Sequence, residues 1–114
     1  MAQGIGTIIF PVRDIAGAKK LYGEILGVKP YVDEAYYVGF KFGEQEIGLD
    51  PHGHIQGMTG PVGYLDVDDI EKTMEQLLDA GARVQQPVKY VGGGKLVASL
   101  KDKDDNVIGL IQST

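Results

Sequence analysis

Two histidines in the middle of the chain are the side chains best suited by type to acid–base or metal chemistry. His52 and His54 form a His-x-His pair within the glycine-rich stretch 50–60. Imidazole titrates near neutral pH and is a common metal ligand, but two imidazoles without a third ligand rarely hold an ion. We therefore expect two solvated loop histidines. The alternative is that His52 lies at the mouth of a ligand cavity.

Two further clusters have the composition of ligand sites but not the required spacing. Residues 92–94 are three glycines followed by Lys95. They lack the phosphate-loop spacing and precede an expected strand, so they predict a flexible hairpin turn, with Lys95 as a candidate contact for a ligand. Asp102, Asp104 and Asp105 are close in sequence, but a calcium loop needs a longer set of ligands and a closing glutamate. They predict a solvated turn.

The sequence pattern of the elements that position these side chains occurs twice along the chain. The stretch VRDI at 12–15 recurs as VDDI at 67–70, an offset of 67 − 12 = 55. The stretch IGL at 47–49 recurs at 108–110, an offset of 108 − 47 = 61. In each half an apolar strand leads through an acidic turn into an amphipathic helix. The chain therefore reads as one unit of about half its length, repeated.

Each half predicts the element order βαβββ. Asp14 and Asp69 are placed to cap the two helices at their N-termini, and Gly27 and Gly81 to end them. Pro87 cannot donate a ladder hydrogen bond, so its strand is expected at a sheet edge. The predicted strands are 5–12, 28–32, 36–42 and 46–49 in the first half and 62–67, 83–90, 96–100 and 107–111 in the second.

Apolar residues at helical or strand spacing predict the core between each helix and its sheet. They are Phe10, Ile15, Leu21, Ile25, Leu65, Ile70, Met74, Leu77, Ile108 and Leu110.

Composition and charge restrict the function classes. The 114 residues suffice for one domain, expected to span 1–114. The net charge, 11 − 16 = −5, argues against a nucleic-acid partner and slightly favours a cationic ligand. The absence of cysteine excludes thiolate metal sites and a cysteine nucleophile, and suits a reducing compartment. We expect a cytoplasmic protein without membrane contact, because the N-terminus lacks a signal pattern and no apolar run approaches about 18 residues.

The repeated pattern resembles the vicinal oxygen chelate superfamily, also called the glyoxalase/bleomycin resistance protein/dioxygenase superfamily. The stretches that carry the resemblance are 12–15, 21–22, 26–27, 67–70, 81–82 and 104–110. The resemblance implies an α+β fold of two βαβββ modules, here 4–51 and 60–112. Each module is expected to curl its mixed sheet, with the helix on the convex side, so that the two together enclose a cavity. This superfamily carries many chemistries on one scaffold, so the resemblance does not name a function.

The resemblance also implies where a metal would bind. Members that bind metal place ligands on the first and last strand of each module, which corresponds here to Thr7, Gly48, Val62 and Gly109. Three of these have no side-chain ligand atom and Thr7 has only a neutral hydroxyl, a poor ligand. We therefore expect no metal and no cofactor, and take these four residues as lining the ligand cavity.

Other residues are expected on the cavity side. Tyr64 and Asp66 share a strand face with the second-module ligand position, since residues two apart lie on one face. Tyr36, Tyr37 and Tyr90 are further candidates for a wall on which a ligand stacks, with ordinary strand packing as the alternative.

Two functions remain open. The first is a metal-independent module that binds or sequesters a small molecule, as in proteins of the bleomycin resistance type. The second is a glyoxalase-like lyase or isomerase, or a dioxygenase-related enzyme, that works without metal or recruits one through Glu46, Asp66 and His52. In both cases a homodimer is expected from the resemblance.

Overall fold

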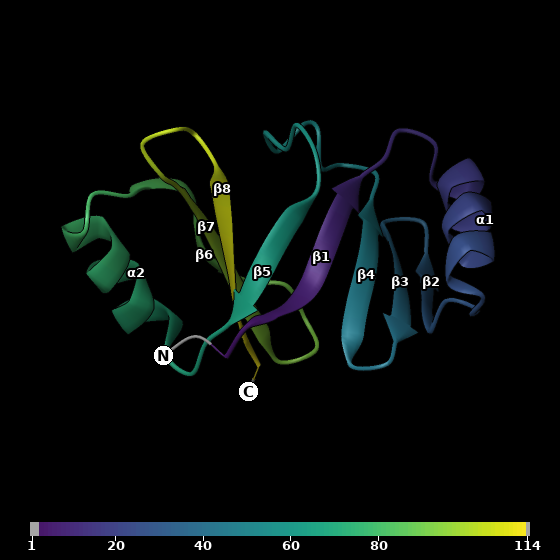
Figure 1. The fold of residues 1–114 in the computed structure, drawn as a ribbon, viewed down its shortest axis with the longest axis horizontal. Coiled ribbons are helices and arrows are strands. Elements are labelled where there is room, and N and C mark those ends of the chain that lie inside the picture. The colour runs from purple at the N-terminus through teal and green to yellow at the C-terminus, as the bar shows by residue number, and fades with distance from the viewer. Residues whose placement is uncertain (1–2, 114) are drawn as a thin grey trace. The chain divides into compact units, whose positions relative to one another are not determined.

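The computed structural model describes residues 3–113 and contains two compact units with the same element order (Figure 1). Residues 6–62 form the N-terminal unit, and residues 63–113 together with 3–5 form the C-terminal unit. Each unit has one strand, one helix and three further strands. This arrangement confirms the predicted α+β fold with a repeated βαβββ order. The assignment of 1–114 to one domain, with module boundaries at 4–51 and 60–112, stays a prediction.

The N-terminal unit packs one helix on a four-stranded mixed sheet. The strands are ordered β2-β3-β4-β1, and β1 runs parallel to β4 while the other neighbours are antiparallel. Val38, Phe40 and Leu49 are its buried core, against which α1 packs. The elements are β1 (Ile5–Pro11), α1 (Ile15–Leu26), β2 (Val32–Glu34), β3 (Tyr37–Phe42) and β4 (Gln45–Asp50).

Helix α1 begins and ends at the residues that the sequence indicates. The carboxylate of Asp14 accepts a hydrogen bond from the backbone N–H of Gly17 at 3.1 Å, which satisfies one of the free amides of the first turn. Gly27 adopts a left-handed conformation with φ 70° and donates its N–H to the Gly23 carbonyl at 2.9 Å. A residue with a Cβ adopts this conformation only with strain, so glycine ends the helix here.

The C-terminal unit repeats this plan with the strand order β5-β8-β7-β6. Strand β6 lies at the sheet edge, as predicted from Pro87, and its pairing with β7 shifts register on both sides of Gln86. The core consists of Val67, Ile70, Met74, Ala98, Leu100 and Leu110. The elements are β5 (Val62–Asp66), α2 (Ile70–Asp79), β6 (Arg83–Tyr90), β7 (Lys95–Lys101) and β8 (Val107–Ser113).

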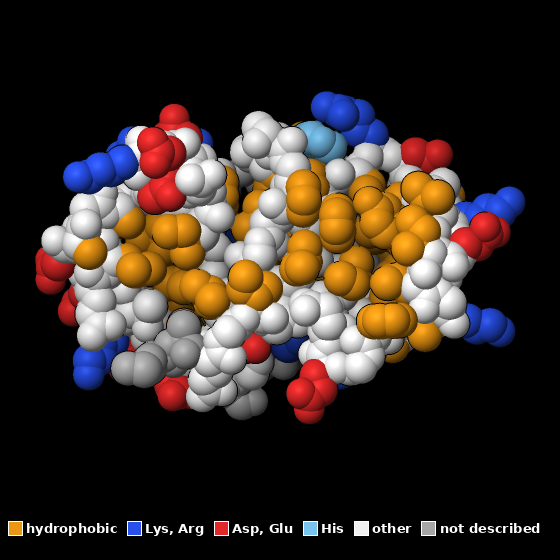
Figure 2. Space-filling view, in the orientation of Figure 1, with side chains coloured by type: hydrophobic (Ala, Val, Ile, Leu, Met, Phe, Trp, Pro, Cys, Tyr) orange, Lys and Arg blue, Asp and Glu red, His pale blue; other side chains and the backbone are white. Residues whose placement is uncertain are grey.

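Two residues predicted in the core lie on the surface. Leu21 is 57% exposed and Ile25 is 67% exposed. Each precedes by one position a residue that packs on the sheet, and one residue is about 100° around a helix, so both point away from it. The residues of α1 that pack on the core are Ile15, Ala18, Tyr22 and Leu26. In Figure 2 hydrophobic side chains are widespread on the visible surface of each unit.

The second strand begins later than predicted. Residues 28–32 were expected to form it, but β2 spans Val32–Glu34. Pro30 has no N–H to donate, so the ladder starts after it, with the Tyr31 N–H bonded to the Gly39 carbonyl at 2.9 Å. Tyr36 precedes β3 and is 64% exposed, so most of its side chain faces solvent. The other predicted strands agree with the structure within two residues.

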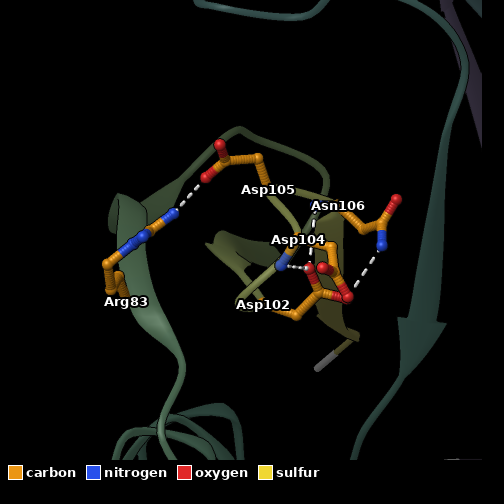
Figure 3. A network of polar contacts seen from close by, with 5 residues as sticks. All are labelled: Arg83, Asp102, Asp104, Asp105 and Asn106. Carbon is orange, nitrogen blue, oxygen red and sulfur yellow. Dashed lines mark hydrogen bonds and ion pairs between the residues drawn. The ribbon is translucent and has the colours of Figure 1, made fainter.

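Asp102, Asp104 and Asp105 lie in the turn between β7 and β8 (Figure 3). One oxygen of Asp102 accepts the backbone N–H groups of Asp104 and Asn106, both at 2.9 Å, and the other accepts the Asn106 side-chain amide at 2.9 Å. These hydrogen bonds, the Asn106 amide first, hold the pKa of the Asp102 carboxyl below its usual value. Asp105 pairs with Arg83 at the start of β6. The Asp102 carboxylate thus organises the turn itself, and the Asp105 carboxylate ties the turn to β6.

No helix within residues 3–113 has the length and apolar character needed to cross a bilayer.

Candidate functional site

The sheet of the N-terminal unit has one face covered by α1 and one that is not. Because strand residues alternate between faces, the core residues of β3 and β4 are separated by residues that point away from α1. We call this second surface the helix-free face. Its residues on β3 and β4 are Tyr37, Gly39, Lys41, Glu46, Gly48 and Asp50.

Two paired glycines leave the backbone of this face uncovered by side chains of their own. Gly39 and Gly48 are direct partners in the antiparallel β3–β4 pair. A Cβ on Gly39 would lie 2.9 Å from the Tyr37 ring and 3.2 Å from the Tyr31 ring. A Cβ on Gly48 would lie 2.2 Å from the Tyr37 hydroxyl oxygen and 2.6 Å from the end of Ile9. Glycine at both positions therefore lets two aromatic rings lie directly on the backbone.

The two rings are held by one carboxylate. The hydroxyl of Tyr37 donates to Oε2 of Glu46 at 2.7 Å, and the hydroxyl of Tyr31 donates to Oε1 of the same residue. Burial and the hydrogen bond to Glu46, in that order, raise the pKa of both phenols, so both stay protonated donors near neutral pH. We call these three residues the Tyr31–Glu46–Tyr37 group.

A lysine completes the surroundings of this group. Lys41 is the strand partner of Glu46 on β3, yet its ammonium lies over the Tyr31 ring, 5.0 Å from the ring centroid. The ion pairs among residues 3–113 are Lys19–Asp33 and Arg83–Asp105, so no described cation pairs with Glu46. The group thus combines a carboxylate, electron-rich ring faces and one loosely placed cation, an arrangement suited to binding rather than to nucleophilic attack.

The four positions that the resemblance assigned to metal ligands lie on strands, as expected. Thr7 is opposite Glu46 in the parallel β1–β4 pair, and Gly48 is opposite Ile9. Val62 is buried at the start of β5. Gly109 on β8 is opposite Tyr64, and a Cβ there would lie 2.7 Å from the Tyr64 ring.

These residues do not fit a metal ion. At Gly48 the space of a ligand side chain holds the Tyr37 phenol, and at Gly109 it holds the Tyr64 ring. A carboxylate or imidazole at either position would have to displace an aromatic side chain. Within residues 3–113 no three or more histidine, aspartate or glutamate side chains gather in a way that suits an ion.

The alternative metal set is divided between the two units, with Glu46 and His52 in the N-terminal unit and Asp66 in the C-terminal unit. Both carboxylate oxygens of Glu46 accept phenol hydroxyls. His52 is exposed and its backbone N–H donates to the Asp50 carboxylate at 2.8 Å. The expectation of a solvated side chain is wrong for His54, which is half-buried with its Nδ1 buried and without a hydrogen-bond partner among the described residues.

The remaining candidates lie in the C-terminal unit. Asp66 closes β5, with its backbone paired to residues 3–4. Tyr90 ends β6, is 65% exposed, and accepts the Gly94 N–H at 3.2 Å. Lys95 opens β7 after the turn at 92–94, whose three glycines all have positive φ. The structure thus contains the predicted hairpin turn, while the ligand-binding roles of these residues stay predictions.

Sequence reasoning missed the Tyr31–Glu46–Tyr37 group, although a signal was present. A two-residue turn at Gly43 and Glu44 fixes the register of the hairpin, so that Phe42 pairs with Gln45 and the two glycines 39 and 48 pair with each other. Paired glycines on the face away from the helix, with tyrosines nearby, indicate rings lying on the sheet. The position of Tyr31, outside any strand, had no such signal.

Comparison with known proteins identifies the family of the chain. The family model of the Glyoxalase/Bleomycin resistance protein/Dioxygenase superfamily matches residues 4–110, and the chain belongs to this superfamily.

Solved structures show the same fold at low sequence identity. The NAD-dependent benzaldehyde dehydrogenase of Legionella pneumophila is 17% identical with a TM-score of 0.77, covering 95% of this chain and 98% of its own. Methylmalonyl-CoA epimerase of Mycobacterium tuberculosis is 15% identical with a TM-score of 0.73, covering 99% and 89%. The Mn(II)-bound glyoxalase of Novosphingobium aromaticivorans is 17% identical with a TM-score of 0.71, covering 97% of this chain and 39% of its own. These likenesses concern the fold, which carries several activities.

Proposed function

We propose that this chain is a metal-independent small-molecule-binding protein that takes its ligand on the helix-free face of the N-terminal unit. The observation that carries the proposal is the placement of Tyr37 and Tyr64 in the space of the metal-ligand side chains at Gly48 and Gly109. Two phenols and a carboxylate offer hydrogen bonds and ring surfaces to a ligand, without a Lewis acid. Sequestration of a drug or metabolite is the role that fits such a surface.

The competing function is a glyoxalase-like lyase or isomerase that binds a metal through Glu46. It requires the phenols of Tyr31 and Tyr37 to release that carboxylate, because both its oxygens now accept them. Each hydrogen bond to a charged group contributes roughly 1.5–3 kcal/mol, so an ion must replace both. The other potential metal ligands are an exposed histidine and aspartates that form no cluster among the described residues. They do not supply a complete coordination sphere.

The experiment is a ligand screen by NMR on protein kept in EDTA. We expect at least one small molecule to shift the backbone amides of residues 37–48. Activity is assayed in parallel with the hemithioacetal of methylglyoxal and glutathione, with and without added Zn²⁺, Mn²⁺ or Ni²⁺. Binding that appears only after metal is added, or turnover that a chelator abolishes, would contradict the proposal.

The proposal includes a cytoplasmic homodimer. Light scattering after size-exclusion chromatography measures the mass, and a single 12.3 kDa species at micromolar concentration would contradict dimerisation. Cell fractionation tests the location, and recovery in the membrane or extracellular fraction would contradict it.

A further inference from the structure

We propose that the Tyr31–Glu46–Tyr37 group binds the primary ammonium group of an organic cation. This inference rests on the proposed function, because it names the class of ligand that the helix-free face takes.

The carboxylate of Glu46 has acceptor capacity left for a ligand. A carboxylate offers about four lone-pair sites, and the two phenols use two of them. The phenols also fix the direction of the carboxylate, so little side-chain freedom remains to be lost when a ligand donates to it. No described cation pairs with this carboxylate. A primary ammonium has three N–H donors and can donate to the acceptor sites of Glu46 that the phenols leave unused.

The rings provide the second element of ammonium recognition. Tyr31 is 48% exposed, so one part of its ring remains accessible to a ligand. The Lys41 ammonium lies 5.0 Å from its centroid, within the range of a cation–π contact, which shows that this ring face accepts a cation. Lys41 is itself exposed and sits on a flexible stem. A ligand ammonium that reaches both the ring and Glu46 would displace it.

The surrounding charge favours a cation over an anion. Asp50 lies close enough to Tyr37 to contribute to the raised pKa of that phenol, so a second carboxylate acts on the same face. The hydroxyls of Tyr31 and Tyr37 already donate to Glu46, which leaves an anionic ligand few donors besides Lys41. The net charge of −5 adds in the same direction.

The test titrates the metal-free protein with n-butylammonium, which copies the end of a lysine side chain, and with 1-butanol as its uncharged counterpart. Backbone amide shifts are followed by NMR at low ionic strength, where a surface cation site is least screened. We expect butylammonium to shift the amides of residues 31, 39 and 46 and butanol to leave them in place.

Matched variants separate this site from a general charge effect. Glu46→Gln should weaken butylammonium binding at least about tenfold, whereas Glu24→Gln, the same charge change on the exposed side of α1, should leave it unchanged. Lys41→Met should tighten binding by removing the competing cation, and Lys20→Met is its control. If Glu46→Gln fails to fold, Tyr31→Leu at a half-exposed position provides the same test through loss of the ring.

Three results would overturn the inference: equal shifts with butanol, equal binding by the two glutamate variants, or shifts that map outside this group. The proposed function would survive any of them if the NMR screen in EDTA finds a neutral or anionic ligand. It would fail separately if no ligand binds without metal. The two failures are therefore distinguishable.

Discussion

Substituting Gly48 tests directly whether the Tyr37 phenol occupies the space that a metal-ligand side chain would need. In Gly48→Ala the added Cβ would lie 2.2 Å from the Tyr37 hydroxyl oxygen and 2.7 Å from its ring. Contacts of this length force the phenol out of its position, which breaks its 2.7 Å hydrogen bond to Glu46. Overpacking costs roughly 1–3 kcal/mol and a hydrogen bond to a charged group roughly 1.5–3 kcal/mol. Because the displaced phenol reaches solvent, we expect a total loss of about 2–3 kcal/mol.

Urea unfolding of four proteins measures this effect as a free energy: wild type, Gly48→Ala, Tyr37→Ala and the double variant. Tyr37→Ala removes the atoms that Gly48→Ala would meet, so the glycine substitution should cost at least about 1 kcal/mol less in that background. Gly60→Ala is the matched control, since nothing lies within 4 Å of a Cβ there, and it should change stability by less than about 0.5 kcal/mol. Equal costs of Gly48→Ala with and without Tyr37 would refute the reasoning.

Three further predictions follow from the fold and the phenols. Asp69→Ala should lower the free energy of unfolding by about 1 kcal/mol, measured in urea, because its carboxylate accepts the Lys72 N–H at the start of α2; no change would mean that the cap is dispensable. Leu21→Ser should cost less than about 0.5 kcal/mol, while Phe40→Ala should cost about 3–5 kcal/mol in the same assay; comparable losses would place Leu21 in the core. Because burial and Glu46 raise the pKa of Tyr37, the folded chain keeps a proton that the unfolded chain releases near pH 10, so stability should fall as the pH rises above about 10. Tyr37→Phe should reduce the fall in the free energy of unfolding between about pH 9.5 and 11.5, by the equivalent of up to about one bound proton. An unchanged pH dependence would contradict the burial of this phenol.

Much of the fold was predictable because local signals agreed. The structure has the predicted N-caps Asp14 and Asp69 and the predicted C-cap Gly27 of α1. Each depends on hydrogen bonds to the backbone within one helical turn. The core prediction failed at Leu21 and Ile25, because an apolar stripe wider than the contact face does not show which edge of it meets the sheet. The packing partners on β3 and β4 decide which side of α1 faces the sheet.

The candidate site was less accessible to sequence reasoning. The absence of ligand atoms at Gly48 and Gly109 was visible, and it led to the expectation of a site without metal. What fills those positions depends on cross-strand neighbours, and Tyr31 directly precedes β2, with its N–H bonded to β3. A tyrosine beside a glycine on a neighbouring strand has no fixed spacing in sequence, so the Tyr31–Glu46–Tyr37 group emerged only from the three-dimensional arrangement.

The most direct measurement is the metal content of protein purified without chelator from cells supplied with Zn²⁺, Mn²⁺ and Ni²⁺. With phenol rings in the space of the ligand side chains at Gly48 and Gly109, we expect far less than one transition-metal ion per chain by plasma mass spectrometry. About one ion per chain, lost in Glu46→Gln and retained in Glu24→Gln, would contradict metal-independent binding.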